Sequence, residues 1–211
     1  MPSWLIPTLI AIAALIAVFV GLRTGLTRSR EGKMLAFVAL FGLPLVAVTF
    51  GFSEQMERAE SRTFCLSCHV MADYGRSLYI DDPSYIPARH FQNNFIPREQ
   101  ACYTCHTNYT MFGTITAKMH GLRHLYIQYF KAVPKPDEIK LYDPFNNREC
   151  LHCHLGARRF EEATGHVKNQ KQPDLLNRVK SNELSCVSSG CHEFIHDVGS
   201  IKDATFWKES Q

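Results

Sequence analysis

The sequence has no large charge imbalance and no signature of hydrolytic or nucleotide chemistry. Its 23 basic and 20 acidic residues leave a formal net charge of only +3 over 211 residues, which does not suggest a surface that binds nucleic acid. It contains no recognisable catalytic triad, no phosphate-binding loop and no low-complexity segment. The chemistry of this chain must therefore rest on other residues.

The chain also has few apolar runs after its first quarter. Hydrophobic residues make up 45% of the sequence, but the first quarter is almost purely apolar and the rest is polar and rich in histidine and cysteine. That remainder is too small, and too poor in periodic apolar residues, to build a large core. We expect bound cofactors to supply the missing apolar bulk, and the chain without them to be largely unfolded.

Four short motifs carry the chemistry. A Cys-x-x-Cys-His sequence is the attachment signature of c-type haem, in which two thiols add to the haem vinyl groups and the histidine binds the iron. Three copies have this spacing, and in the fourth copy four residues separate the cysteines. Gly190 could let those extra residues loop out. The motifs occupy residues 65–69, 102–106, 150–154 and 186–192.

All eight cysteines belong to these motifs, so none remains for a disulfide. A pair of zinc sites is the main alternative, but zinc does not require a histidine directly after every second cysteine. The pattern therefore predicts four covalent haems. The expected attachment residues are Cys65, Cys68, Cys102, Cys105, Cys150, Cys153, Cys186 and Cys191, and the expected proximal iron ligands are His69, His106, His154 and His192.

Three further histidines are candidates for the opposite side of three irons. His90, His166 and His196 each lie near a motif but not inside one. Ligation by two histidines gives haems of low potential that transfer electrons and have no open coordination site. The alternative for each of the three is an exposed or hydrogen-bonded histidine without an iron.

The first haem differs because Met71 follows His69 by two residues. A ligand so close in sequence approaches the same face of the ring as His69, so Met71 would replace it or merely pack beside it. Methionine ligation would raise the potential of this haem relative to the others. The far face of haem 1 would then be left for another group, or partly open.

Two uncharged apolar runs precede the motifs. Residues 4–22 and 34–52 are each long enough to cross a bilayer as a helix. The start of the chain lacks the positive n-region of a signal peptide, which favours a retained helix over a cleaved one. A buried hairpin in a soluble protein is the other alternative. The basic linker 23–33 predicts a cytoplasmic loop, which puts the haem motifs in the periplasm.

We therefore predict an all-α protein in two parts. Residues 1–53 form a transmembrane helical hairpin. Residues 54–211 form a compact multihaem domain that has little regular structure beyond short helices. Within that domain, residues 113–132 have the apolar spacing of an amphipathic helix.

These features resemble the NapC/NirT family, including NrfH-type proteins, of membrane-anchored tetrahaem quinol dehydrogenases. The resemblance covers residues 62 to about 198 and rests on the sequence Arg-Thr-Phe-Cys-Leu-Ser-Cys-His-Val-Met at 62–71, the four motifs, His196, and Lys118 with the following residues 121–126. It implies that quinol docks beside haem 1 near the membrane. It also implies that Lys118 lines the quinol site. The family's acidic residue falls at His124, which could accept a quinol proton or could ligate haem 1.

Two departures from the family pattern separate the functional alternatives. The family usually has one membrane helix, whereas two are predicted here, and the fourth motif is longer than usual. The first function is a quinol-oxidising subunit of the bacterial inner membrane, with haems 2–4 passing electrons to a periplasmic redox partner. The second is an electron relay within a larger membrane complex, without its own quinol site. A catalyst that uses an open iron ranks last, because only haem 1 offers one.

Overall fold

The computed structural model describes residues 5–22, 25, 28–107, 113–139, 145–168, 173–187, 191–192, 195–196 and 198–207. The chain divides into two compact units, Met1–Glu60 and Ser61–Gln211. In the described parts of both units the regular structure is helical, apart from one isolated bridge between Ile80 and Phe206. This confirms the all-α prediction.

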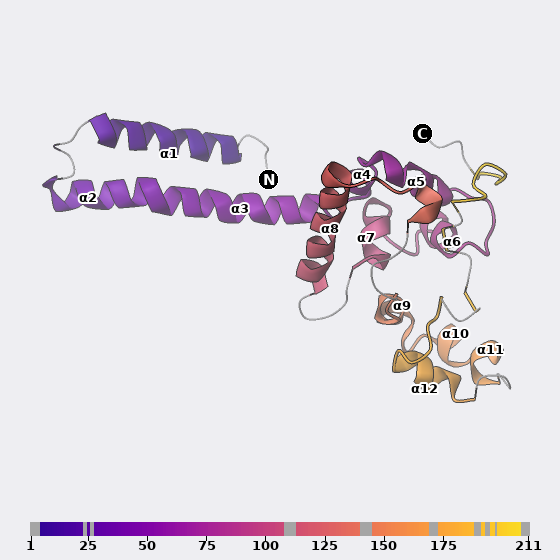
Figure 1. Cartoon of the computed structure of the whole chain (residues 1–211). Coiled ribbons are helices and arrows are strands. Elements are labelled where there is room, and N and C mark those ends of the chain that lie inside the picture. Colours follow the sequence, from indigo (N-terminus) through magenta and orange to yellow (C-terminus); the bar gives the residue numbers. More distant parts are fainter. Residues whose placement is uncertain are drawn as a thin grey trace. The chain divides into compact units, whose positions relative to one another are not determined.

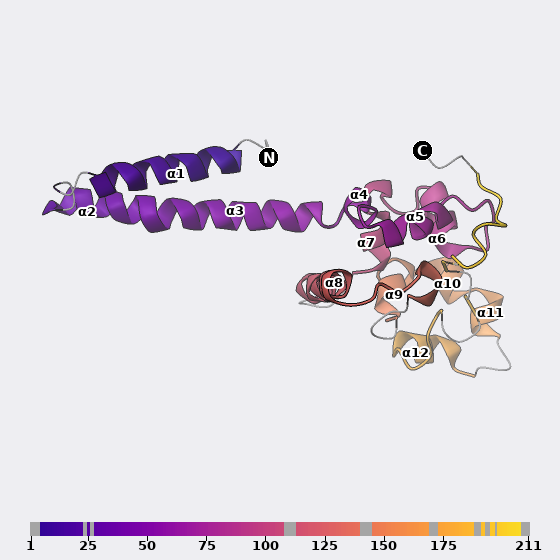
Figure 2. The same cartoon turned by 45° about the horizontal axis from the view of Figure 1, so that its top comes forward.

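The first unit is a pair of apolar helices. α1 (Leu5–Leu22) packs against a longer helical rod made of α2 (Arg30–Phe37), the π-helical turn η2 (Val38–Gly42) and α3 (Leu43–Arg58). Figures 1 and 2 both draw α1 alongside this rod. Ser29 begins the rod, because its hydroxyl accepts a 3.0 Å hydrogen bond from the Gly32 N–H.

The rod continues through Pro44 because of the π-helical turn just before it. The Leu43 N–H bonds back to the Val38 carbonyl, which is the wider π-type spacing. Proline removes a backbone donor and crowds the preceding turn, and apolar membrane helices tolerate it where such local adjustments are made. The helix therefore runs past the apolar segment at 34–52 and ends at Arg58.

The surface of this unit fits lipid rather than water. Residues 30–58 form the one helix in the described part of the chain that is long and apolar enough to span a membrane, and only 11% of its apolar window is buried. α1 contributes a shorter apolar segment, Pro7–Phe19. Small residues are buried in this unit, namely Ala13, Ala39 and Ala47. Small residues at a helix contact let backbones approach closely, as in membrane-embedded helix pairs.

The second unit is built from short helices. Their bounds are α4 Arg62–Cys65, η3 His69–Met71, α5 Ala72–Ser77, α6 Ile86–Gln92, η4 Arg98–Gln100, α7 Ala101–Cys105, α8 Gly113–Phe130, η5 Pro136–Glu138, α9 Arg148–His154, α10 Arg158–Glu161, α11 Thr164–Val167 and α12 Leu175–Lys180. Apart from the 18-residue α8, each is at most two turns long. Such helices depend on tertiary contacts, because isolated short helices are marginal in water.

Among the described residues of this unit, two small apolar clusters form in place of one large core. The first joins Leu78, Phe91, Ile96 and Ala101, and the second joins Leu151, Phe160, Leu175 and Val179. Ala101 of the first cluster comes directly before motif two, and Arg62, shortly before motif one, lies over the ring of Phe91 in this cluster. The second lies under motifs three and four, with Cys186 packed against it.

Candidate haem sites

Three of the four motifs begin on or within a short helix. α4 ends at Cys65, α7 contains Cys102 and Cys105, and α9 contains Cys150 and Cys153. A helical turn places residues three apart on one face, so both thiols of a Cys-x-x-Cys pair point the same way. All eight cysteines are free thiols. The structure therefore leaves every attachment cysteine available for a covalent cofactor.

The four motifs lie next to one another in numerical order. The thiols of Cys65 and Cys102 share a hydrogen bond, which lowers the pKa of Cys65 to about 7. Burial, followed by the charges of Glu149 and Cys153, raises the pKa of Cys105, so motif two also borders motif three. α4 contacts α7, and α7 contacts α9.

The last step of this row joins motifs three and four. A hydrogen bond from the Cys150 thiol to Cys186 lowers the pKa of Cys186. The backbone N–H of Cys186 also donates to the side-chain carbonyl of Asn147, at 2.9 Å. The attachment points thus form a continuous row from motif one to motif four.

Three pairs of histidine rings lie opposite one another with similar distances between their centres. The ring centres lie 6.3 Å apart for His106 and His196, 6.0 Å for His90 and His154, and 6.2 Å for His166 and His192. A metal–imidazole nitrogen bond is about 2 Å long and the ring centre lies about 1 Å beyond the nitrogen, so two imidazoles on opposite sides of one metal have centres about 6 Å apart. Each pair combines one motif histidine with one of the three candidate distal ligands.

The second nitrogen of each candidate distal histidine is held by the protein. Nδ1 of His90 lies 2.8 Å from the Ile86 carbonyl, and Nδ1 of His166 lies 2.9 Å from the Phe160 carbonyl. A carbonyl can only accept, so Nδ1 carries the proton in both rings and Nε2 keeps its lone pair. A metal-binding histidine is typically oriented in this way.

In His196 a serine, rather than a backbone carbonyl, holds the proton on Nδ1. Its Nδ1 lies 2.6 Å from Oγ of Ser77. The Ser77 hydroxyl donates its own proton to the Tyr74 carbonyl at 2.7 Å, so it accepts from His196. Burial, with a smaller effect of His106, lowers the pKa of His196 to about 4, so the ring is neutral at pH 7. Neutral imidazole with a free Nε2 lone pair is the form that binds iron.

These donors fit covalent haem better than zinc. Thiol pairs that share a face, each followed by a histidine, match the attachment chemistry of c-type haem. Within the described ranges, no group of three or more histidine, cysteine and acidic side chains is arranged to hold a single metal ion. A structural zinc site needs four such ligands around one ion.

At the first motif, His69 and Met71 both remain candidates for the iron ligand. His69 and Met71 both lie in the single turn η3. Leu66, between the two thiols of this motif, packs tightly on Gly75: a Cβ added to Gly75 would lie 2.6 Å from a Leu66 methyl carbon. The absence of a side chain at Gly75 therefore allows α5 to lie close against motif one.

The two candidate quinol residues lie on α8. The Lys118 Nζ lies 4.4 Å from the centre of the Tyr103 ring, within motif two. After the Cys102 hydrogen bond, the Lys118 charge is a further cause that lowers the pKa of Cys65. Partial desolvation, followed by the charges of His120 and Arg123, lowers the pKa of His124. The structure thus places Lys118 against motif two with its charge acting on motif one, and the surroundings of His124 disfavour the charged form of its ring.

Two structurally important residues had no sequence signal. Ser77 is fully buried and holds His196, and Asn147 is 1% exposed. Asn147 donates to the carbonyls of Val179 (2.9 Å) and Leu184 (2.7 Å) while it accepts from Cys186. Its position before α9 is typical of a helix N-cap, yet its side chain does not cap that helix. Neither serine nor asparagine binds haem iron, so the sequence gives no reason to single out Ser77 or Asn147.

A helical membrane anchor joined to a unit of thiol-pair motifs and paired histidines defines a membrane-anchored multihaem c-type cytochrome. The sequence profile described as "NapC/NirT cytochrome c family, N-terminal region" matches residues 27–199. The chain belongs to the NapC/NirT cytochrome c family.

Curated relatives agree with this assignment. The cytochrome c-type protein NapC of Escherichia coli strain K12 is 25% identical over 157 residues, which cover 69% of this chain and 72% of the relative. The denitrification system component NirT of Stutzerimonas stutzeri is 22% identical over 157 residues with the same coverage. No solved structure matches the chain. The protein is therefore a membrane-anchored electron-transfer protein with covalently bound c-type haem.

Proposed function

We propose that this protein oxidises membrane quinol beside haem 1 and passes the electrons through haems 2, 3 and 4 to a periplasmic redox partner. The observation that carries this proposal is the Lys118 ammonium, which lies against motif two and acts electrostatically on Cys65 of motif one. A cation at this position can hydrogen-bond a quinol oxygen and stabilise negative charge on it. The haems supply the redox chemistry, and the protein positions them and tunes their potentials.

The row of motifs supports the order of transfer. Motif one borders motif two, motif two borders motif three, and motif three borders motif four. His124 is the proposed acceptor for a proton released from the quinol, and its lowered pKa favours a neutral ring before the transfer and ready release of the proton afterwards. With the basic linker 23–33 in the cytoplasm and both apolar helices crossing the inner membrane, protons would be released on the periplasmic side.

The three histidine pairs supply the proposed iron ligands. His106 and His196 would hold the iron of haem 2, His154 and His90 that of haem 3, and His192 and His166 that of haem 4. The ring separations and the Nδ1 hydrogen bonds support these pairs. For haem 1, His69 and Met71 remain alternatives on one face, and His124 could supply the other face.

The ligand pairs can be tested one iron at a time. Replacing His90, His166 or His196 by alanine should convert one of the bis-histidine low-spin haems to high spin, while mass spectrometry still counts four haems. His152→Ala is the matched control, because this histidine lies inside motif three and is not assigned to an iron. Unchanged low-spin electron paramagnetic resonance signals in a distal-histidine variant would remove that residue from its pair.

The quinol site is tested by Lys118→Ala in membrane nanodiscs. The rate of haem reduction is measured against quinol concentration, and Lys202→Ala controls for the loss of an exposed lysine. Loss of a charged hydrogen-bond donor should raise the quinol concentration needed for half-maximal rate roughly tenfold or more. All four haems should stay in place. Normal turnover in Lys118→Ala would count against this site.

The alternative function is an electron relay inside a larger membrane complex. Two features favour it. One is the additional apolar helix α1, which packs along α3, and the other is the histidine at position 124. A titration with a quinone analogue separates the two functions. A spectral shift at haem 1 supports a quinol site, whereas the absence of any shift supports the relay.

A further inference from the structure

A stripe of large apolar side chains runs along α8 and is exposed. Ile115, Met119, Leu122, Tyr126 and Tyr129 recur at alternating intervals of four and three residues, which places them on one face of the helix. Exposure is greatest near the end of the helix, where Tyr129 is 76% and Phe130 is 75% exposed. A contiguous exposed patch of this kind marks a surface that contacts another phase or molecule.

The end of the stripe lies about three turns along α8 from the residue that contacts motif two. Lys118, near the beginning of α8, is the residue that approaches motifs one and two. A helix rises about 1.5 Å per residue, so Tyr129 lies about 16 Å farther along the axis. The described part of this unit leaves Tyr126, Tyr129 and Phe130, in the C-terminal half of α8, more than half exposed, so they are open to contact with another surface.

The segment that carries the stripe has only positive charges, up to the acidic residues Asp137 and Glu138 that follow it. Between residues 113 and 136 the sequence contains no aspartate or glutamate but has four strongly basic residues, Lys118, Arg123, Lys131 and Lys135. The whole chain has a net charge of only +3, so this segment concentrates positive charge. The complementary surface is apolar and negatively charged, which describes a bilayer that contains anionic lipid.

The side chains at the end of α8 suit the headgroup region in particular. Tyr126 and Phe130 stack with ring centres 5.4 Å apart, and the Lys131 ammonium lies 5.7 Å from the Tyr126 ring. Tyrosine has an apolar ring with a polar tip, and lysine can extend its charge toward water while its stem lies on apolar surface. Both residue types are enriched where a bilayer meets water.

We propose that the C-terminal half of α8, residues 122–131, lies on the surface of the membrane, with its apolar stripe among the headgroups of anionic lipids. The chain's own membrane-spanning helix keeps this segment close to a bilayer, so a weak surface contact suffices. Such a contact would orient the haem unit on the membrane. It does not depend on whether Lys118 binds quinol.

The test uses the full-length haem-loaded protein in nanodiscs that contain a photoactivatable phospholipid. Mass spectrometry maps the lipid adducts after illumination. Peptides that span 122–131 should be labelled several times more strongly than peptides that contain Phe95 or Val167, which are exposed apolar residues elsewhere in the same unit. Equal labelling of all three segments, or no labelling of α8, would overturn the proposal.

Substitutions distinguish contact with lipid from contact with a second copy or with a haem. Tyr129→Ser should reduce labelling of α8, and Phe95→Ser should not. Lys131→Glu should lower labelling by roughly threefold in nanodiscs with anionic lipid and have little effect in purely zwitterionic ones. A cross-link between two copies through Tyr129, or a changed haem spectrum in Tyr129→Ser with α8 unlabelled, would overturn the proposal in favour of a dimer or a haem contact. Quinol-dependent reduction is measured separately, so failure of one proposal leaves the other intact.

Discussion

The two halves of the haem unit hold their motifs in different ways. The first half, residues 61–107, surrounds Phe91, which is 2% exposed. The guanidiniums of Arg62 and Arg98 each lie 5.4 Å from the centre of its ring. Gln92 adds hydrogen bonds to the carbonyls of Leu78 and Ile80. Several contacts therefore share the task of positioning motifs one and two.

The second half, residues 145–187, concentrates that task in one side chain. Asn147 uses both of its amide protons and its carbonyl to join the segments that carry motifs three and four. The backbone N–H of Asn147 adds a fourth hydrogen bond, which it donates to the side-chain carbonyl of Asn182 at 2.8 Å. The comparison indicates that a small haem unit can be secured either by many partial contacts or by one buried polar residue, and that the second way is more vulnerable to a single substitution.

The largest effect is expected for Asn147→Leu. This change keeps the branched shape of the side chain but removes all three of its hydrogen bonds. The Leu184 carbonyl and the Cys186 N–H are left without a partner, whereas the Val179 carbonyl still accepts from the Asn182 N–H at 3.1 Å. Each buried unsatisfied group costs about 1–3 kcal/mol, so we expect a loss of roughly 3 kcal/mol or more in the free energy of unfolding. Thermal unfolding followed by haem-region circular dichroism measures it, and mass spectrometry shows whether the proposed haems 3 and 4 are still attached.

Asn93→Leu in the first half is the matched control. Asn93 is exposed and makes one hydrogen bond to the Arg89 carbonyl, at 2.8 Å. Its replacement should change stability by only about 0.5 kcal/mol. Equal destabilisation by the two leucine variants would refute the difference between the halves.

The next effect is expected for Ser77→Ala. His90 and His166 are oriented by backbone carbonyls, whereas His196 depends on the Ser77 hydroxyl. Losing this acceptor makes the imidazole less basic and a weaker ligand for oxidised iron. The potential of the proposed haem 2 should therefore rise by roughly tens of millivolts. A redox titration measures this, with the exposed Ser84→Ala as control. An unchanged potential would argue against His196 as a ligand.

The residues that carry local signals were predictable from sequence, and those that act across long separations were not. The four motifs are contiguous sequences, and the apolar runs that predict membrane helices are equally local. Ser77 and His196, by contrast, lie 119 residues apart. Nothing in the sequence around His90 assigns it to His154 rather than to another motif. Asn147 was missed because an asparagine before a helix usually indicates only a cap.

A smaller effect, confined to the first half, is expected for Gly75→Ala. The new Cβ would lie 2.6 Å from Cδ2 and 3.1 Å from Cδ1 of Leu66, so Leu66 must rotate between the two thiols of motif one. We expect a loss of about 1 kcal/mol and a changed spectrum of haem 1. Adding Leu66→Ala should relieve the contact and restore the spectrum.

Gly165→Ala in the second half is the matched control for this glycine. No heavy atom lies within 4 Å of the Cβ that the substitution would add, and the residue lies within α11. The change should leave stability equal or slightly higher, by about 0.5 kcal/mol, because alanine favours the helix. If Gly75→Ala behaves in the same way, the close packing of α5 on motif one is not needed.

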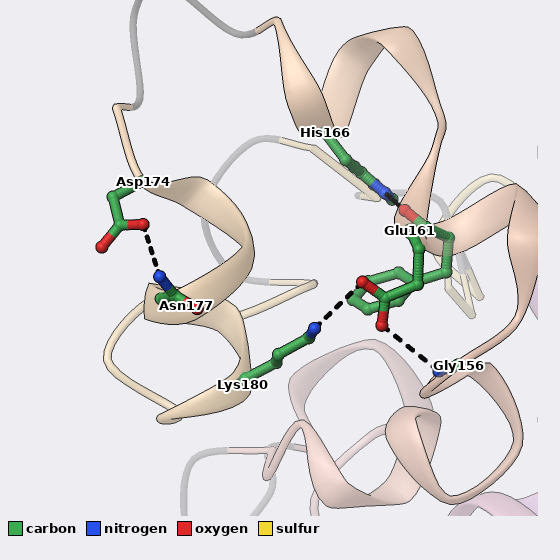
Figure 3. A network of polar contacts seen from close by, with 7 residues as sticks. Gly156, Glu161, His166, Asp174, Asn177 and Lys180 are labelled. Atoms are coloured by element: carbon green, nitrogen blue, oxygen red, sulfur yellow. Dashed lines mark hydrogen bonds and ion pairs between the residues drawn. The ribbon is translucent and has the colours of Figure 1, made fainter.

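The smallest effect is expected at an ion pair on the surface of the second half. The Lys180 ammonium lies 3.0 Å from Glu161, which also accepts a hydrogen bond from the Gly156 N–H (Figure 3). Chiefly through the Lys180 hydrogen bond, the pKa of Glu161 is held below its ordinary value of 4.5. A lowered carboxyl pKa stabilises the folded state at pH values above that ordinary value, and this contribution is lost as the pH falls through the folded-state pKa.

Lys180→Ala should therefore lower the unfolding temperature slightly at pH 7 and not at all below the folded-state pKa of Glu161. Because the pair is exposed, the difference should also shrink in high salt. A difference that persisted in acid would mean that Lys180 acts through the packing of its stem rather than through its charge.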